Sequence, residues 1–187
     1  MKKYLLLLFL FGITLNASSQ SQFNKPQGYM GLVEVGGGIG MGDWGANRVS
    51  VTMINGYRII PQFAAGIGVG AQMLIYSVFD GNNDQRDIVM SLPVFLHLRS
   101  DFIEGKVSPF VALNIGYNVL TSDDIKDGLT FEPMVGVSFN LGKKRMTAGV
   151  GFSMSKINYE VSNGGWSYYD FGSATGSALT FKVGYSF

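Results

Sequence analysis

The chain has 187 residues, with 14 basic and 13 acidic residues, 26 glycines and no cysteine. The lack of cysteine excludes a disulfide framework, a thiolate metal site and a lipid-modified N-terminal cysteine, and the net charge of +1 gives no support for a nucleic-acid partner. Only 14% of the residues are charged, although a soluble domain usually carries about 25 to 35% charged residues on its surface.

The first segment predicts a secretory signal peptide over residues 1–19. Two lysines precede an apolar run over residues 4–15, and small residues follow over 17–19. The alternative is a membrane anchor, but this run is shorter than the roughly 20 apolar residues that a spanning helix needs. We expect residues 20–27 to be a loose polar segment and residues 28–187 to form one domain.

From residue 28 onward, large apolar residues alternate with small or polar residues. This period of two predicts β-strands, because successive side chains of a strand point to opposite faces. Ile67 and Val69, for example, alternate with Gly66, Gly68 and Gly70. The alternating segments cover, in chain order, residues 28–41, 48–58, 62–76, 88–99, 107–120, 129–141, 146–155 and 178–187.

The connections between these segments alternate in length. Short turns are expected near residues 58–62, 101–106 and 142–145. Longer polar loops are expected over residues 80–87, 121–128 and 160–176. The predicted fold is all-β: an eight-stranded antiparallel up-and-down transmembrane β-barrel, with both chain ends on the short-turn side.

The two faces of the strands indicate how such a barrel is oriented. In a soluble barrel or sandwich the large apolar side chains would point inward, and an eight-stranded interior is too narrow to hold about five from each strand. If the large side chains face outward, glycine and small polar residues fill the lumen and the apolar residues contact lipid. A closed barrel also satisfies every backbone hydrogen bond within a membrane.

Five stretches together resemble the small outer-membrane β-barrel domains of Gram-negative bacteria, of the eight-stranded OmpA and OmpX type. The stretches are NGYRIIPQFAAGIGVG, PVFLHLRSDF, KVSPFVALNIGYN, VGVSFNLGKKR and ALTFKVGYSF. The resemblance implies an outer-membrane location in contact with lipid, with both termini in the periplasm. It also implies that the last strand, with Tyr185 and Phe187, is the signal read by the barrel-assembly machinery. The alternative is that Phe187 only completes an apolar row. The family brings no catalytic residues to this chain.

Charged residues on the lumen-facing side of the strands are candidates for an internal polar network. They are Glu34, Arg48, Arg99, Glu132 and Lys182. Depth along the strands places Lys182 near Glu34, and Arg48 with Glu132 toward the loops. We expect ion pairs and hydrogen bonds that plug the lumen, because unpaired charges in so narrow a space are costly. The alternative is a narrow path for ions or small solutes.

Other motifs give little support for catalysis or cofactor binding. GMGDWG (residues 40–45) has the spacing of a dinucleotide loop, but an alternating strand follows it instead of the required helix. His97 is the only histidine, so an imidazole metal cluster is excluded. Some outer-membrane barrels are lipid-modifying enzymes, but His97 is expected to face the lumen near the short turns, away from outer headgroups. We therefore predict no cofactor, no metal and no enzyme activity.

Aromatic residues gather in the last long loop. Four of them form a candidate interaction surface for an extracellular ligand: Trp166, Tyr168, Tyr169 and Phe171. They could equally fold the loop on itself or rest at lipid headgroups. The sequence thus predicts an outer-membrane barrel with a structural or surface-interaction role, with a small-solute pore and a lipid-modifying enzyme as alternatives.

Overall fold

The computed structural model describes residues 27–42, 45–80, 83–103, 105–120, 125–126, 128–141, 144–162 and 169–187. Side chains are not described for residues 77–87, 120–127 and 157–173. The predicted signal peptide and all but the last residue of the polar segment 20–27 lie outside the described residues. Among those described, no helix is long and apolar enough to cross a membrane.

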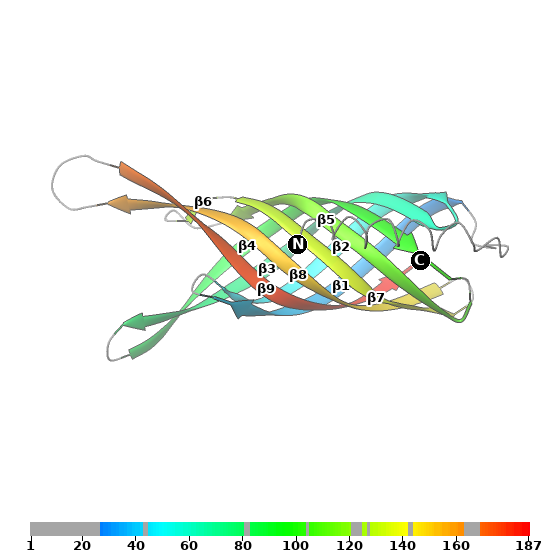
Figure 1. Cartoon of the computed structure of the whole chain (residues 1–187), viewed down its shortest axis with the longest axis horizontal. Helices are drawn as coiled ribbons and strands as arrows, with labels where there is room; N and C mark the ends of the chain where they lie inside the picture. Colours follow the sequence, from blue (N-terminus) through cyan, green and yellow to red (C-terminus); the bar gives the residue numbers. More distant parts are fainter. Residues whose placement is uncertain are drawn as a thin grey trace, which may run out of the picture.

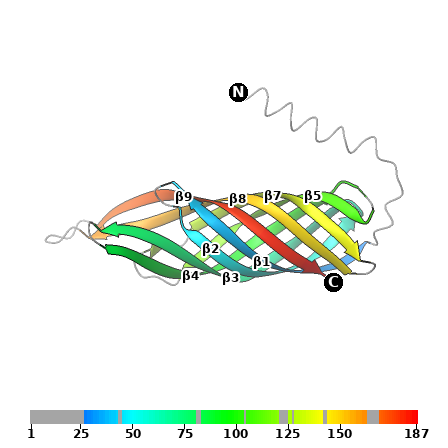
Figure 2. The ribbon, with the colours of Figure 1, turned by 90° about the horizontal axis from the view of Figure 1, so that it is seen from below.

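The described chain is organised as β-strands. In chain order these are β1 (Gly28–Met41), β2 (Asn47–Ile60), β3 (Phe63–Asp80), β4 (Asn83–Asp101), β5 (Val107–Leu120), β6 (Ile125–Lys126), β7 (Gly128–Leu141), β8 (Lys144–Ser162) and β9 (Tyr169–Ser186). Each of the eight long strands pairs antiparallel with its neighbours, and β9 pairs with both β8 and β1, so the sheet closes (Figures 1 and 2). The two-residue β6 pairs with β8. The predicted fold, an eight-stranded antiparallel up-and-down β-barrel, is confirmed.

Both chain ends of the barrel lie beside the short turns. The turn between β2 and β3 has only two residues, Pro61 and Gln62. Next to it, Gly28 at the start of β1 pairs with Arg58 near the end of β2. At the other end of the chain, the backbone N–H of Phe187 donates to the carbonyl of Gly31 at 3.0 Å. With the reciprocal bond from Gly31 N–H to the Phe187 carbonyl at 3.3 Å, it extends the β1–β9 pairing that closes the barrel.

Two hairpins are longer than the alternation predicts. The pairing of β3 with β4 continues to Asp80 and Asn83, and the pairing of β8 with β9 continues to Ser162 and Tyr169. Most of the segments predicted as loops, 80–87 and 160–176, therefore continue strands that extend beyond the barrel wall (Figure 1). Large apolar residues alternate with small or polar residues only where the two faces of a strand have different surroundings. The alternation therefore ends where the strands leave the barrel. Backbone pairing between strands does not need different surroundings on the two faces, so it continues.

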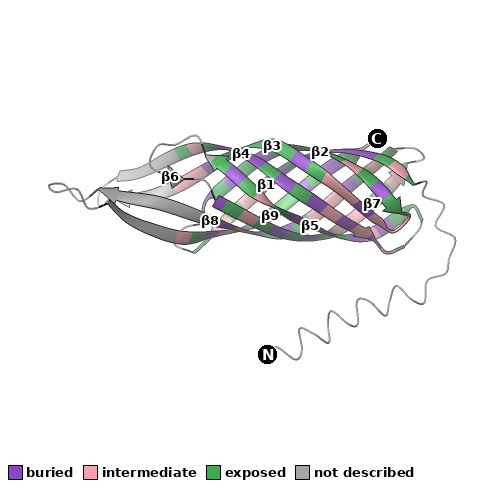
Figure 3. Cartoon of the chain, turned by 90° about the horizontal axis from the view of Figure 1, so that it is seen from above, coloured by how far each residue is buried: buried purple, intermediate pink, exposed green. Residues whose placement is uncertain are grey.

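The faces of the barrel are oriented as the sequence predicts. Buried and exposed residues alternate along the strands (Figure 3). Val183 and Val35 are 57% and 55% exposed on neighbouring strands, whereas the inward-facing Thr52 and Thr180 are buried. The barrel exterior is therefore an apolar surface, which we call the outer belt. It comprises the exposed aliphatic and aromatic residues of all eight long strands.

The interior also holds large apolar side chains, which the general pattern does not predict. Leu32, Ile54 and Phe95 belong to one buried cluster, and Phe110 and Met134 belong to another. Glycine provides the necessary space. A Cβ atom at Gly68 would lie 2.3 Å from the Phe95 ring, so this ring occupies the volume that a side chain on β3 would fill.

We expect Gly116→Ala to destabilise the barrel, because a methyl group there has no room. Its Cβ would lie 2.2 Å from the carbonyl oxygen of Val94 and 2.4 Å from Cβ of Phe95. The free energy of unfolding should fall by about 1 to 3 kcal/mol, as measured by urea unfolding in detergent micelles. The matched control is Gly37→Ala, whose Cβ would be 3.8 Å from the nearest atom. Equal stability of the two variants would contradict this account of the packing.

Candidate functional site in the barrel interior

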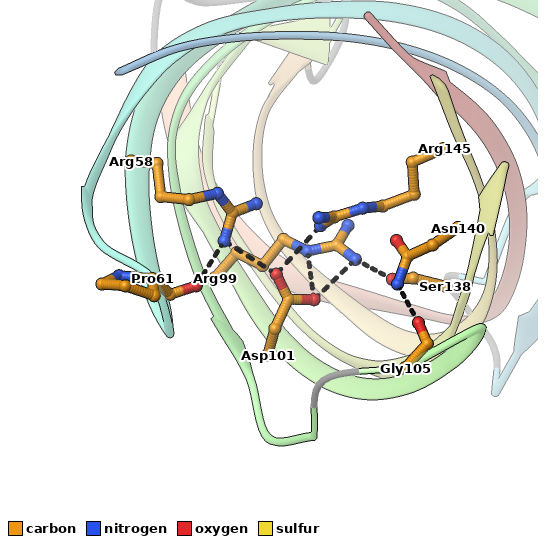
Figure 4. A network of polar contacts seen from close by, with 8 residues as sticks. All are labelled: Arg58, Pro61, Arg99, Asp101, Gly105, Ser138, Asn140 and Arg145. Carbon is orange, nitrogen blue, oxygen red and sulfur yellow. Dashed lines mark hydrogen bonds and ion pairs between the residues drawn. The ribbon is translucent and has the colours of Figure 1, made fainter. Parts of the chain in front are cut away.

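One polar network lies at the short-turn end of the barrel and centres on Asp101, the last residue of β4 (Figure 4). Oδ2 of this fully buried carboxylate accepts from Arg58 on β2 and from Arg145 on β8, each at 3.0 Å. Its Oδ1 accepts from Arg99 on the same strand at 3.1 Å. We call these four side chains the Asp101 cluster. They join strands from different sides of the barrel across the lumen.

Further contacts fix the arginines of this cluster. Arg58 also donates to the carbonyl of Pro61 at 2.9 Å, and Arg99 donates to the Ser138 hydroxyl. The Arg99 guanidinium stacks on the ring of Phe110, with its central carbon 3.8 Å from the ring centre. Cation–π contacts of desolvated arginines are favourable. Among the described residues, three cations thus share the Asp101 carboxylate, and the cluster depends on its charge.

A second network lies further along the lumen and centres on Glu132 of β7. Its carboxylate accepts from the Thr180 hydroxyl and from the Asn114 amide, each at 2.9 Å, and it forms an ion pair with Lys182. Nδ1 of His97 donates to the amide oxygen of Asn114 at 2.7 Å. The resulting chain of contacts, which we call the Glu132 network, connects β4, β5, β7 and β9.

All five predicted lumen residues lie buried in the interior. Arg99 belongs to the Asp101 cluster, and Glu132 and Lys182 belong to the Glu132 network. Glu34 has one carboxylate oxygen without a hydrogen-bond partner. Nη1 of Arg48 donates to the Ser153 hydroxyl at 2.8 Å. Lys182 pairs with Gly36 on β1, two residues from Glu34, as depth along the strands predicts. Its ion pair is nevertheless with Glu132 on β7. Arg48 and Glu132 also line one cavity, in agreement with their similar depth.

The sequence interpretation missed Asp101, Arg58 and Arg145. Asp101 continues the parity of His97 and Arg99, so alternation could have identified it if the fourth strand had been extended by two residues. Its position falls within the turn predicted near residues 101–106. Arg145 likewise falls within the turn predicted near residues 142–145. Charged residues at strand ends are easily mistaken for turn residues, because turns are also polar.

The Glu132 network lines a small internal cavity of about 30 Å³. Its wall also includes Arg48, Thr52 and Gln72. A cavity of this size has room for only about one or two water molecules. Within the part of the chain that the structure describes, no three His, Asp or Glu side chains gather in a way that could hold a metal ion.

The predicted assembly signal lies on the exterior. Tyr185 and Phe187 are 39% and 54% exposed, and their ring centres are 6.4 Å apart. The Phe187 ring covers Gly31, where a Cβ atom would lie 2.6 Å from the ring. Of the predicted loop surface, Trp166 and Tyr168 lie outside the described residues. Tyr169 and Phe171 belong to β9, but their side chains are not described.

No protein-family model matches the sequence, and no curated protein is similar to it at the sequence level. Solved structures share its fold. The outer membrane protein OprG from Pseudomonas aeruginosa is 10% identical, with a TM-score of 0.60 over 89% of this chain and 99% of that one. The outer membrane protein AlkL is 16% identical, with a TM-score of 0.58 over 91% and 93%. Neisserial surface protein A is 13% identical, with a TM-score of 0.55 over 83% and 95%. The predicted resemblance to small outer-membrane barrels is thus confirmed at the level of the fold.

Proposed function

We propose that this protein is an outer-membrane β-barrel with a plugged lumen and a structural or surface-interaction role. The outer belt supports the location, because such a continuous apolar exterior is stable in contact with hydrocarbon. In the proposed orientation, the long hairpins β3–β4 and β8–β9 lie outside the cell, and both termini lie in the periplasm. Outer-membrane lipid is then the main partner, and the barrel-assembly machinery reads the last strand during biogenesis.

The plugged lumen is supported by the barrel interior. The Asp101 cluster and the Glu132 network connect opposite walls at two levels, and the cavity that the second network lines is only about 30 Å³. A solute path would require both sets of buried ion pairs to separate, which leaves charges without partners. This arrangement favours a closed barrel over a small-solute pore.

The proposal gives the chain no catalytic role. His97 is 1% exposed, and its Nδ1 is engaged by Asn114 within the barrel. A side chain in this position has no access to lipid headgroups, so it is a poor candidate for a general base in lipid modification. The extended hairpins, and the aromatic residues Tyr169 and Phe171 in the sequence of β9, instead favour a role in binding an extracellular ligand.

We expect the wild-type protein to give no channel events in planar lipid bilayers. Glu132→Gln and Lys182→Met should also give none, but each should unfold at a lower urea concentration, because each leaves a buried partner uncompensated. Reproducible wild-type conductance steps would overturn the plugged lumen and favour the narrow pore. The location is tested separately by heat-dependent gel mobility of the membrane fraction. A protein that does not sediment with membranes would contradict an outer-membrane barrel.

A further inference from the structure

Arg48 is a buried cation without a carboxylate partner. It projects from β2 into the lumen and is 8% exposed, and its hydrogen bond is to the neutral hydroxyl of Ser153. Within the described residues no ion pair joins it to an acidic side chain. Glu132 lines the same cavity, but its oxygens already accept from Lys182, Thr180 and Asn114. A buried charge is costly unless an opposite charge compensates it.

Three polar atoms without hydrogen-bond partners belong to residues that line this cavity. They are Nε of Arg48, Nε2 of Gln72 and Oγ1 of Thr52. Arg48 and Thr52 point inward from β2 on either side of Ser50, and Ser50 pairs directly with Gln72 on β3. Two of the three atoms are N–H donors only. The third, the Thr52 hydroxyl, lies opposite Glu34 on β1 and interacts with its carboxylate. The groups at this wall that lack a hydrogen-bond partner in the cavity are therefore donors.

We infer that the cavity binds a small monovalent anion of the halide class, such as chloride, held by Arg48 and Gln72. A water molecule would satisfy the donors, but it would leave Arg48 to share the negative charge of Glu132 with Lys182. A cation is disfavoured because both Arg48 and Lys182 line the cavity. A halide ion is similar in size to water, so it fits a cavity that is large enough to hold water. The site is separate from the proposed interaction surface, since it lies within the barrel.

Diffraction from crystals grown in sodium bromide tests the inference directly. We expect an anomalous difference peak within hydrogen-bond distance of Arg48 Nε and Gln72 Nε2. In Gln72→Leu, which keeps the charge of Arg48 but removes one donor, the occupancy of bromide should fall. The absence of an anomalous peak at these atoms in the wild-type crystals would overturn the inference and identify the contents of the cavity as water.

Thermal unfolding in detergent gives an independent readout. At constant ionic strength, replacing gluconate by chloride should raise the wild-type unfolding midpoint by about 3 to 6 °C once chloride reaches about ten times its dissociation constant. Arg48→Met should lose this response. The matched control Lys156→Met removes an exposed cation from β8 and should retain it. If Arg48→Met does not fold, Gln72→Leu serves as the second variant, with a weakened chloride response expected. An equal chloride response in the wild type and in Arg48→Met, or in Gln72→Leu where Arg48→Met does not fold, would overturn the inference.

Discussion

Replacing Asp101 with asparagine is expected to lower the free energy of unfolding by about 3 to 5 kcal/mol, because it leaves buried guanidinium groups without a counter-charge. The side chain is fully buried and accepts from Arg58, Arg99 and Arg145. Asparagine keeps the shape and one acceptor oxygen, but it provides no negative charge. The measurement is urea unfolding in detergent micelles, followed by tryptophan fluorescence.

A double-mutant cycle with Arg145→Gln distinguishes the ion cluster from simple packing loss. Arg145 is the most exposed of the three arginines, with 15% of its side chain accessible. When Asp101 is already asparagine, removing one of the competing cations should cost less than it does in the wild type. The two losses should therefore not add. Additive losses would show that Asp101 and Arg145 do not act as a pair.

Replacing Val35 with arginine is expected to cost about 2 to 4 kcal/mol in lipid bilayers, because it places a charge on the lipid-facing side near the bilayer midplane. Val35 lies in the middle of β1 and is 55% exposed. It pairs with Val51 on β2 and with Val183 on β9. The measurement is reversible urea unfolding of the protein in lipid vesicles.

Ile60→Arg is the matched control for depth. Ile60 is the last residue of β2, beside the turn at Pro61, and it is 48% exposed. Arginine at a membrane interface costs only about 0 to 1 kcal/mol, so this variant should be nearly as stable as the wild type. Equal stability of Val35→Arg and the wild type in vesicles would show that the outer belt does not face hydrocarbon.

The two interior networks block the lumen in different ways. The Asp101 cluster is rich in cations and joins β2, β4 and β8 beside the short turns. The Glu132 network is built around one ion pair and several neutral hydrogen bonds, and it lies beside the cavity assigned to an anion. Loss of either should weaken the barrel without opening it, because the other still spans the lumen.

Local alternation was sufficient to predict the strands and their faces. The pleat of a strand sends successive side chains to opposite sides wherever the strand lies, so Val35 and Val183 could be assigned to the exterior and Glu34 and Lys182 to the interior from their parity alone. The bounds of β1 and β5 match the predicted segments 28–41 and 107–120. Ile54 departs from the alternation of its segment, because it is an apolar residue on the inward side that packs in the buried cluster with Phe95.

The sequence by itself therefore determined an all-β barrel with an apolar exterior, a glycine-rich and polar interior, and both chain ends beside the short turns. Only the tertiary structure decided which inward side chains meet: Lys182 with Glu132, and Asp101 with arginines from β2 and β8. It also decided that the β3–β4 and β8–β9 hairpins continue beyond the wall. The physical reason is that parity depends on one strand at a time, whereas contacts across the lumen depend on the tilt and stagger of all eight strands around the closed barrel.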